Sequence, residues 1–95
     1  MEVRVDCRAT ERGWRCNVGV GTDPAATAHA VTVSGDTLRE LAPTDADPVR
    51  LVTESFHFLL AHEPRESILR SFDLPVIGRY FPGWEREVRA RLGER

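Results

Sequence analysis

One stretch of the chain, residues 48 to 62 (PVRLVTESFHFLLAH), constrains the fold most, because it alone is long and periodic enough to form a core helix. Asp47 is suited to cap its first turn, and Pro48 fits the first helical position. Pro64 cannot continue a helix. The apolar residues recur at steps of three and four, which predicts one buried side formed by Val49, Val52, Phe56, Leu59 and Leu60.

The first third of the chain alternates polar and apolar residues, as strands with one buried face do. Residues 2 to 9 and 14 to 20 show this pattern, and the stretch TERG between them supplies the glycine of a hairpin loop. A four-residue loop fixes the register, so the expected inner pairs are Ala9 with Trp14, Cys7 with Cys16, Val5 with Val18 and Val3 with Val20. Residues 28 to 34 predict a third strand of ambiguous facing, for which we favour an inner set of His29, Val31 and Val33.

The rest of the chain has helical spacing. Ser34 or Asp36 can cap a short helix with Leu38 and Leu41 on one side, and residues 42 to 47 form a linker to the long helix. Three more helices are expected after Pro64, with buried residues Ile68, Leu69 and Phe72, then Val76, Ile77, Tyr80 and Phe81 behind an Asp73 cap, then Trp84, Val88 and Leu92. The sequence therefore predicts one α+β domain over residues 1 to 95, with a three-stranded antiparallel β-meander (1 to 34) and about five helices (35 to 95) on one of its faces.

Composition places the chain among ordinary globular proteins, with 41% apolar and 29% charged residues. It contains no apolar run of the roughly 20 residues that cross a bilayer, and its N-terminus lacks the apolar core of a secretory signal. We therefore expect a cytoplasmic protein without membrane contact. All 13 basic residues are arginine, but the net charge of −2 gives no general attraction to nucleic acid.

The segment ESILRSFDLPVIGRYFP, at residues 66 to 82, carries a resemblance. Together with SFHFLL before it, the segment resembles the C-terminal signature of a group of small uncharacterised bacterial proteins. The resemblance covers roughly the last half of the chain. It implies no activity, ligand or catalytic residue.

Two groups of side chains raise the question of thiol or metal chemistry. The hairpin register sets Cys7 opposite Cys16, and in a cytoplasmic protein we expect two reduced thiols packed as small apolar groups, with a redox-formed bridge as the alternative. Glu54 and His57 lie three apart, as in half of a di-iron site, but the chain has no second copy of this motif. We therefore expect no catalytic residue, metal site or cofactor.

Charge on the outer face of the hairpin suggests a binding surface. The register sets Arg8 opposite Arg15, with Arg4 further along the strand and Arg12 in the turn. Solvent and the acidic residues on the same face can offset this repulsion; alternatively, an anion, an acidic protein surface or an RNA backbone lies across the sheet. Aromatic residues that would stack on bases are absent from this face.

These features predict a non-enzymatic binding or regulatory module that acts through protein contacts. The alternative is a nucleic-acid-binding accessory protein that uses the Arg-bearing hairpin face. The C-terminal elements carry more aromatic residues than a small sheet can cover, which predicts a twofold homodimer with its contact at these helices or at a sheet edge. The aromatic interface residues expected there are Tyr80, Phe81 and Trp84.

Overall fold

The computed structural model describes residues 1 to 42 and 47 to 93, so most of the expected linker at 42 to 47 lies outside the described residues. The strands are β1 (Val3–Ala9), β2 (Gly13–Val20), β3 (Thr27–Ser34) and β4 (Ser71–Asp73). The α-helices are α1 (Gly35–Leu41), α2 (Pro48–His62), α3 (Ile77–Tyr80) and α4 (Trp84–Gly93). Two short 3-10 helices, η1 (Arg65–Ser67) and η2 (Leu74–Val76), flank β4. None of the described helices is long and apolar enough to cross a membrane.

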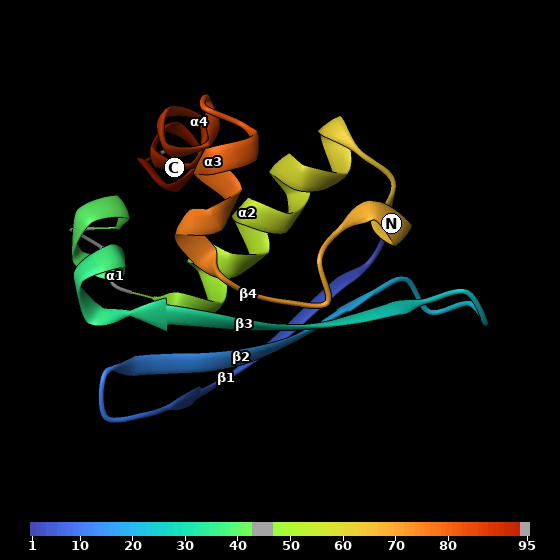
Figure 1. Cartoon of the computed structure of the whole chain (residues 1–95), viewed down its shortest axis with the longest axis horizontal. Helices are drawn as coiled ribbons and strands as arrows, with labels where there is room; N and C mark the ends of the chain where they lie inside the picture. The colour runs from blue at the N-terminus through green and yellow to red at the C-terminus, as the bar shows by residue number, and fades with distance from the viewer. Residues whose placement is uncertain (43–46, 94–95) are drawn as a thin grey trace.

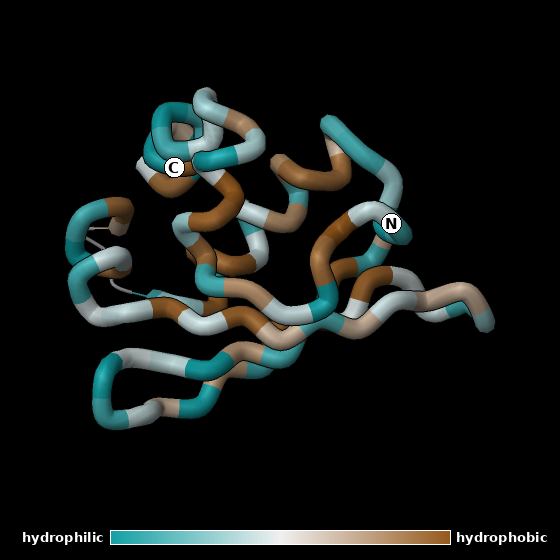
Figure 2. Tube along the Cα trace, viewed as in Figure 1, coloured by the Kyte–Doolittle hydropathy of each residue, from teal (hydrophilic) through white to brown (hydrophobic). Residues whose placement is uncertain are grey.

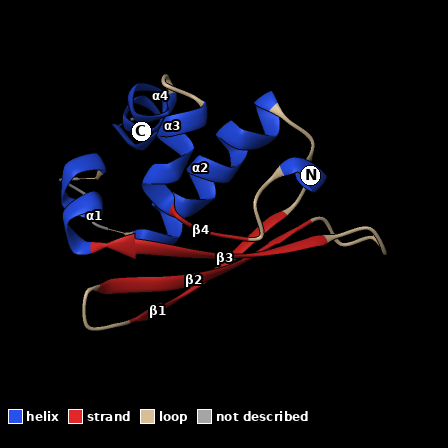
Figure 3. Ribbon diagram, viewed as in Figure 1, coloured by secondary structure: helices blue, strands red, loops and turns tan. Residues whose placement is uncertain are grey.

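The four strands form one sheet in the order β1-β2-β3-β4, and the helices lie together on one side of it (Figures 1 and 3). The first three strands are antiparallel neighbours, whereas β4 pairs with β3 in the parallel direction. The predicted α+β class is therefore confirmed. The details are corrected, since the described chain has a four-stranded mixed sheet and four α-helices in place of a three-stranded meander and about five helices.

The hairpin register is the predicted one in every pair from Val3 with Val20 to Ala9 with Trp14. The turn requires glycine at position 13, because a Cβ atom there would lie 2.0 Å from the carbonyl oxygen of Val33. The third strand also has the predicted facing, with its inner residues 0 to 4% exposed: His29, Val31 and Val33. The alternation of residue types was therefore sufficient to place the inner face of the first three strands.

Helix α2 begins and ends where the sequence predicted, and the Asp47 carboxylate accepts a hydrogen bond from the backbone N–H of Val49. Its buried side is wider than predicted, since Leu51 and Phe58 are also buried. Val49, in contrast, is 38% exposed. Helix α1 is capped by Ser34, the first of the two caps considered.

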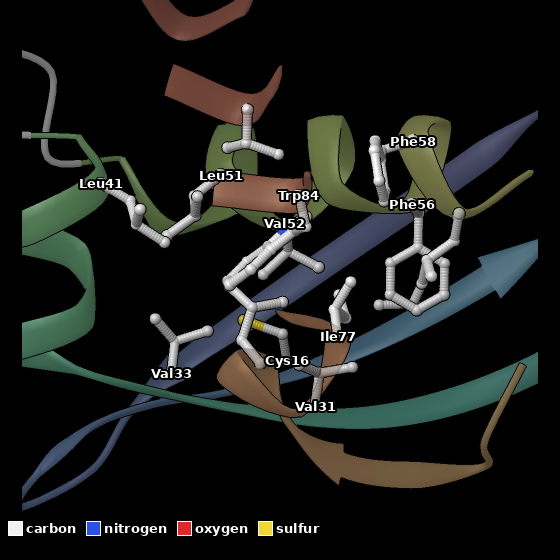
Figure 4. Packing of buried hydrophobic residues seen from close by; sticks show 14 of the residues in the cluster. Cys16, Val31, Val33, Leu41, Leu51, Val52, Phe56, Phe58, Ile77 and Trp84 are labelled. Atoms are coloured by element: carbon white, nitrogen blue, oxygen red, sulfur yellow. The ribbon is translucent and has the colours of Figure 1, made fainter. Parts of the chain in front are cut away.

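The core lies between the helices and the inner face of the sheet, where the most hydrophobic segments of the chain converge (Figure 2). Trp84, at the start of α4, is 1% exposed and belongs to the same buried cluster as Leu51, Val52, Val33 and Cys16 (Figure 4). Its indole N–H donates to the buried Ser55 hydroxyl at 3.1 Å, so the polar edge of this large side chain is satisfied inside the protein.

Residues 64 to 73 do not form the predicted helix. After the single turn of η1, the chain extends, and the backbone N–H of Ala30 donates to the carbonyl oxygen of Arg70 at 2.8 Å. β4 then pairs with the otherwise open edge of β3, which provides backbone partners that helical spacing cannot reveal. Ile68 is buried as expected, but Leu69 is 47% exposed. Asp73 does not cap the next helix with its side chain, because its carboxylate accepts from the Thr32 hydroxyl.

Cys7 and Cys16 are joined by a disulfide, so the expectation of two reduced thiols is wrong. Backbone hydrogen bonds from Thr10 to Gly13 and from Gly21 to Glu2 show that even-numbered residues of β1 make the bonds to β2. The Cys7–Cys16 pair is therefore of the non-hydrogen-bonded kind, in which opposed residues approach most closely. Their Cα atoms are only 4.0 Å apart, which brings the two sulfur atoms within bonding reach.

Candidate functional site

The outer face of the sheet is open and polar, in contrast to the helix-covered inner face. Strand pairing sets one row of side chains across all four strands: Arg8, Arg15, Thr32 and Asp73. Arg8 and Arg15 are exposed neighbours, as the hairpin register predicted. Two like charges directly opposite each other disfavour a sheet, so this pair needs a compensating interaction or a partner.

Three of the four predicted arginines have no carboxylate partner among the described residues, namely Arg8, Arg12 and Arg15. Four arginines elsewhere in the described chain have one, namely Arg39, Arg65, Arg89 and Arg91, whereas Arg70, Arg79 and Arg86 lack one but are not neighbours on one face of the sheet. The Asp73 carboxylate at the end of the same row is engaged by the Thr32 hydroxyl. The charges of Arg8, Arg12 and Arg15 are therefore not neutralised by ion pairs within the described protein.

Arg12 and Arg15 line a shallow open hollow of about 650 Å³ at the hairpin end of the face. The turn is held in place because the carbonyl oxygen of Arg12 accepts a hydrogen bond from the Gly35 backbone N–H at 3.0 Å. Hydroxyl groups complete much of the lining, from Thr10, Thr32, Ser34 and Thr37. Guanidinium and hydroxyl donors in one hollow suit an anionic group such as a carboxylate, provided that it contacts the arginines and avoids Glu11 and Asp73, which line the same hollow.

Arg4, the fourth predicted arginine, is placed differently. Its guanidinium extends over Gly19 on the neighbouring strand, where a Cβ atom would lie 2.8 Å from an Arg4 nitrogen. It also approaches the Glu2 carboxylate at 3.7 Å. The structure therefore groups Arg8, Arg12 and Arg15 and separates Arg4 from them.

The predicted aromatic interface is divided between surface and core. Tyr80 is 67% exposed, and Phe81 is partly buried with its ring edge-on to Phe58 at 6.0 Å between centroids. Trp84 belongs to the core of the monomer and offers no exposed surface for an interface. Tyr80 and Phe81 border an apolar groove of about 200 Å³ between the end of α2 and α3.

The histidine residues have structural partners. The buried His29 ring contacts the carbonyl oxygen of Leu69 at 2.7 Å and the Thr27 hydroxyl at 2.8 Å. Glu54 lies 3.9 Å from His57 and 3.4 Å from Arg91, so the suspected half of a metal site is part of an ion-pair group. Across the described ranges, no group of three or more His, Cys, Asp or Glu side chains could hold a metal ion.

Arg65, unlike the arginines of the hollow, has a carboxylate partner within the described protein. Arg65 donates to both carboxylate oxygens of Asp23 at 2.9 Å. These hydrogen bonds lower the pKa of Asp23 and raise the pKa of Arg65 from their ordinary values. The arginines around the hollow have no such bidentate partner among the described residues, which makes them the candidate binding groups.

Sequence reasoning found the arginines of this site but missed its other half. Thr32, Ser34 and Thr37 follow from strand β3 and the cap of α1, but their position beside Arg12 depends on a turn-to-helix hydrogen bond. Asp73 reaches the face only because β4 joins the sheet. Comparisons of the chain with protein-family models, with curated proteins and with solved structures found no match, so its function is argued from this geometry alone.

Proposed function

We propose that the protein is a non-enzymatic binding module that engages an acidic protein surface with the outer face of its sheet. The observation that carries this proposal is the cluster of Arg8, Arg12 and Arg15 without carboxylate partners among the described residues. An acidic partner would offset the repulsion between the opposed Arg8 and Arg15 and would fill the hollow beside Arg12.

Two properties of the face favour a protein partner over nucleic acid. The acidic residues Asp6, Glu11 and Asp73 lie on or beside the face, and an extended phosphate backbone would meet their negative charge. Trp14, which belongs to the inner set of the hairpin and is partly buried, is the one aromatic residue among the described residues that line the hollow, so a series of stacked bases would find no platform there. A partner with separate carboxylates can place them on the arginines and avoid the acidic positions.

The test compares an oligo-glutamate peptide with a single-stranded oligonucleotide of the same net charge, both titrated at low salt. We expect the peptide to bind more tightly, and Arg12→Gln/Arg15→Gln to weaken its binding by about tenfold. Arg79→Gln/Arg86→Gln is the matched control, because these arginines are exposed on other elements and the substitution changes the net charge equally.

Three results would contradict the proposal. The first is the absence of peptide binding even at low salt, and the second is an equal loss in the control variant, which would indicate general charge attraction. Tighter binding of the oligonucleotide would favour the nucleic-acid-binding alternative instead.

A further inference from the structure

Within residues 1 to 42 and 47 to 93, β1 is an edge strand whose outward backbone groups have no partner strand. It pairs with β2 on one side only, and the bonds to β2 come from its even-numbered residues, as the Glu2 and Thr10 contacts show. The N–H and C=O groups of Val3, Val5 and Cys7 therefore point to the open side. The strand is seven residues long, contains no proline and pairs without a bulge, so it is an intact template for another strand.

The apolar side of this strand is also incompletely covered. Cys16, Val18 and Val20 on β2 are 0 to 2% exposed, whereas their partners on β1 are only partly buried: Cys7, Val5 and Val3. Helix α2 packs against β1, but it leaves the outermost part of the inner face open to solvent. A strand added beside β1 would cover these side chains on its inner face.

The charges on the outer side of β1 and just before it alternate in sign in a self-complementary order, namely Glu2, Arg4, Asp6 and Arg8. Two copies of β1 that pair antiparallel about a twofold axis at Val5 place Arg4 opposite Asp6 of the second copy and Glu2 opposite Arg8 of the second copy. All four cross-strand charge pairs are then between opposite charges. The same register makes Val5 with Val5 and Val3 with Cys7 the hydrogen-bonded pairs, which uses the free backbone groups.

Neighbouring registers lack this match. An axis at Arg4 places Arg4 on Arg4, and an axis at Asp6 places Asp6 on Asp6 and Arg4 on Arg8. Axes at Val3 or Cys7 retain only two of the four opposite-charge pairs. The charge order therefore specifies one register, just as charge pairs specify register in other sheets.

From the free edge, the half-covered apolar side and the charge order, we infer that the occupant of the β1 edge is a second copy of this chain, paired antiparallel about Val5. The two four-stranded sheets then form one continuous sheet with the helices of both copies on the same face. The hollows at Arg12 and Arg15 lie on the opposite face of that sheet and stay open, whereas Arg8 of the proposed partner site pairs with Glu2 of the second copy.

Sedimentation equilibrium at micromolar concentrations tests this register. The wild-type protein should have twice the mass of one 10.7 kDa chain. Asp6→Arg sets two pairs of like charges across the axis and should weaken the dimer by about 10- to 100-fold. The exchange variant Arg4→Asp/Asp6→Arg restores opposite charges at the same positions and should recover dimerisation, which a merely misfolded strand would not do.

Arg86→Asp, on the exposed part of α4, is the control for a change of charge remote from β1 and should remain a dimer. A single-chain mass for the wild type would overturn the inference, as would a dimer unaffected by Asp6→Arg or an exchange variant that stays monomeric. None of these outcomes depends on peptide binding, so the self-association and the proposed function stand or fall separately.

Discussion

The two faces of the sheet are built from the same strands but follow opposite physical rules. On the inner face, alternate residues lie under the helices, and those from Cys16 to Val20 and from His29 to Val33 are at most 4% exposed, whereas Trp14 is partly buried. On the outer face, the intervening residues of the same strands are mainly charged or small and remain in solvent. Neighbouring residues on a strand therefore have different roles. One side chain packs under the helices and stabilises the protein, and the next is exposed and available for binding.

This difference shows where substitutions should matter for stability and where they should matter for recognition. Burial of large side chains dominates the free energy of folding, whereas exposed charges contribute little to it. The inner face should then be sensitive to small changes in volume. The outer face should tolerate substitution and can even be destabilised by its own charges, as the opposed Arg8 and Arg15 illustrate.

The largest effect is expected at Phe56, which is fully buried and packs against the rings of His29 and Phe72 at centroid distances of 5.4 and 6.1 Å. We predict that Phe56→Ala lowers the free energy of unfolding by about 3–5 kcal/mol, because it leaves a cavity under the inner face. Urea denaturation measures the loss. Val49→Ala on the same helix is the matched control, and because Val49 is 38% exposed, it should change stability by less than about 1 kcal/mol. If Phe56→Ala lowered the free energy of unfolding by less than about 1 kcal/mol, buried side chains of the inner face would contribute no more to stability than exposed ones.

A smaller effect is expected for the disulfide, which links the partly buried Cys7 on β1 to the fully buried Cys16 on β2. Its two cysteines are separated by nine positions, and closing a loop of this size restricts the unfolded chain enough to stabilise the protein by about 2–3 kcal/mol. Reducing the disulfide of the wild-type protein should therefore lower the urea concentration at the midpoint of unfolding. This test needs no substitution. Thiol titration of the denatured, unreduced protein gives the complementary measurement: two free thiols there would show that the bridge does not form.

Regular alternation made the inner face predictable from sequence. Residue type indicates the inner face in β1 to β3, although Ala9 at the end of β1 is exposed, and proline and aspartate mark the start of α2. Residues 68 to 73 were less predictable, because Ile68, Leu69 and Phe72 have helical spacing although this segment is extended. Its conformation depends on backbone bonds to β3, forty positions away in the chain, which no local pattern contains.

The candidate site was likewise predictable where it depends on the hairpin, and less predictable where it depends on contacts between distant residues. Arg8 and Arg15 were placed opposite each other by hairpin register, and Arg12 by its position in the turn. The redox state of the cysteines was mispredicted, because the prediction rested on an expected compartment and gave little weight to the close approach of a non-hydrogen-bonded pair. Trp84 was assigned to an interface because the C-terminal elements carry more aromatic residues than a small sheet was expected to cover. The structure buries Trp84 in the monomer instead, and its acceptor Ser55 lies 29 positions earlier.

The smallest predicted effect has the opposite sign and distinguishes the faces most directly. Arg15→Gln removes one of two opposed positive charges on the outer face but keeps an unbranched side chain with a polar end. Because like charges across a strand pair are destabilising, the variant should be more stable than the wild type by about 0.2–1 kcal/mol, and the gain should shrink in high salt. Arg79→Gln, exposed on α3 with no ion pair in the described protein, should show no comparable gain. A loss of stability in Arg15→Gln would mean that the arginine supports the sheet through packing of its aliphatic stem, and the outer face would then share the structural role of the inner one.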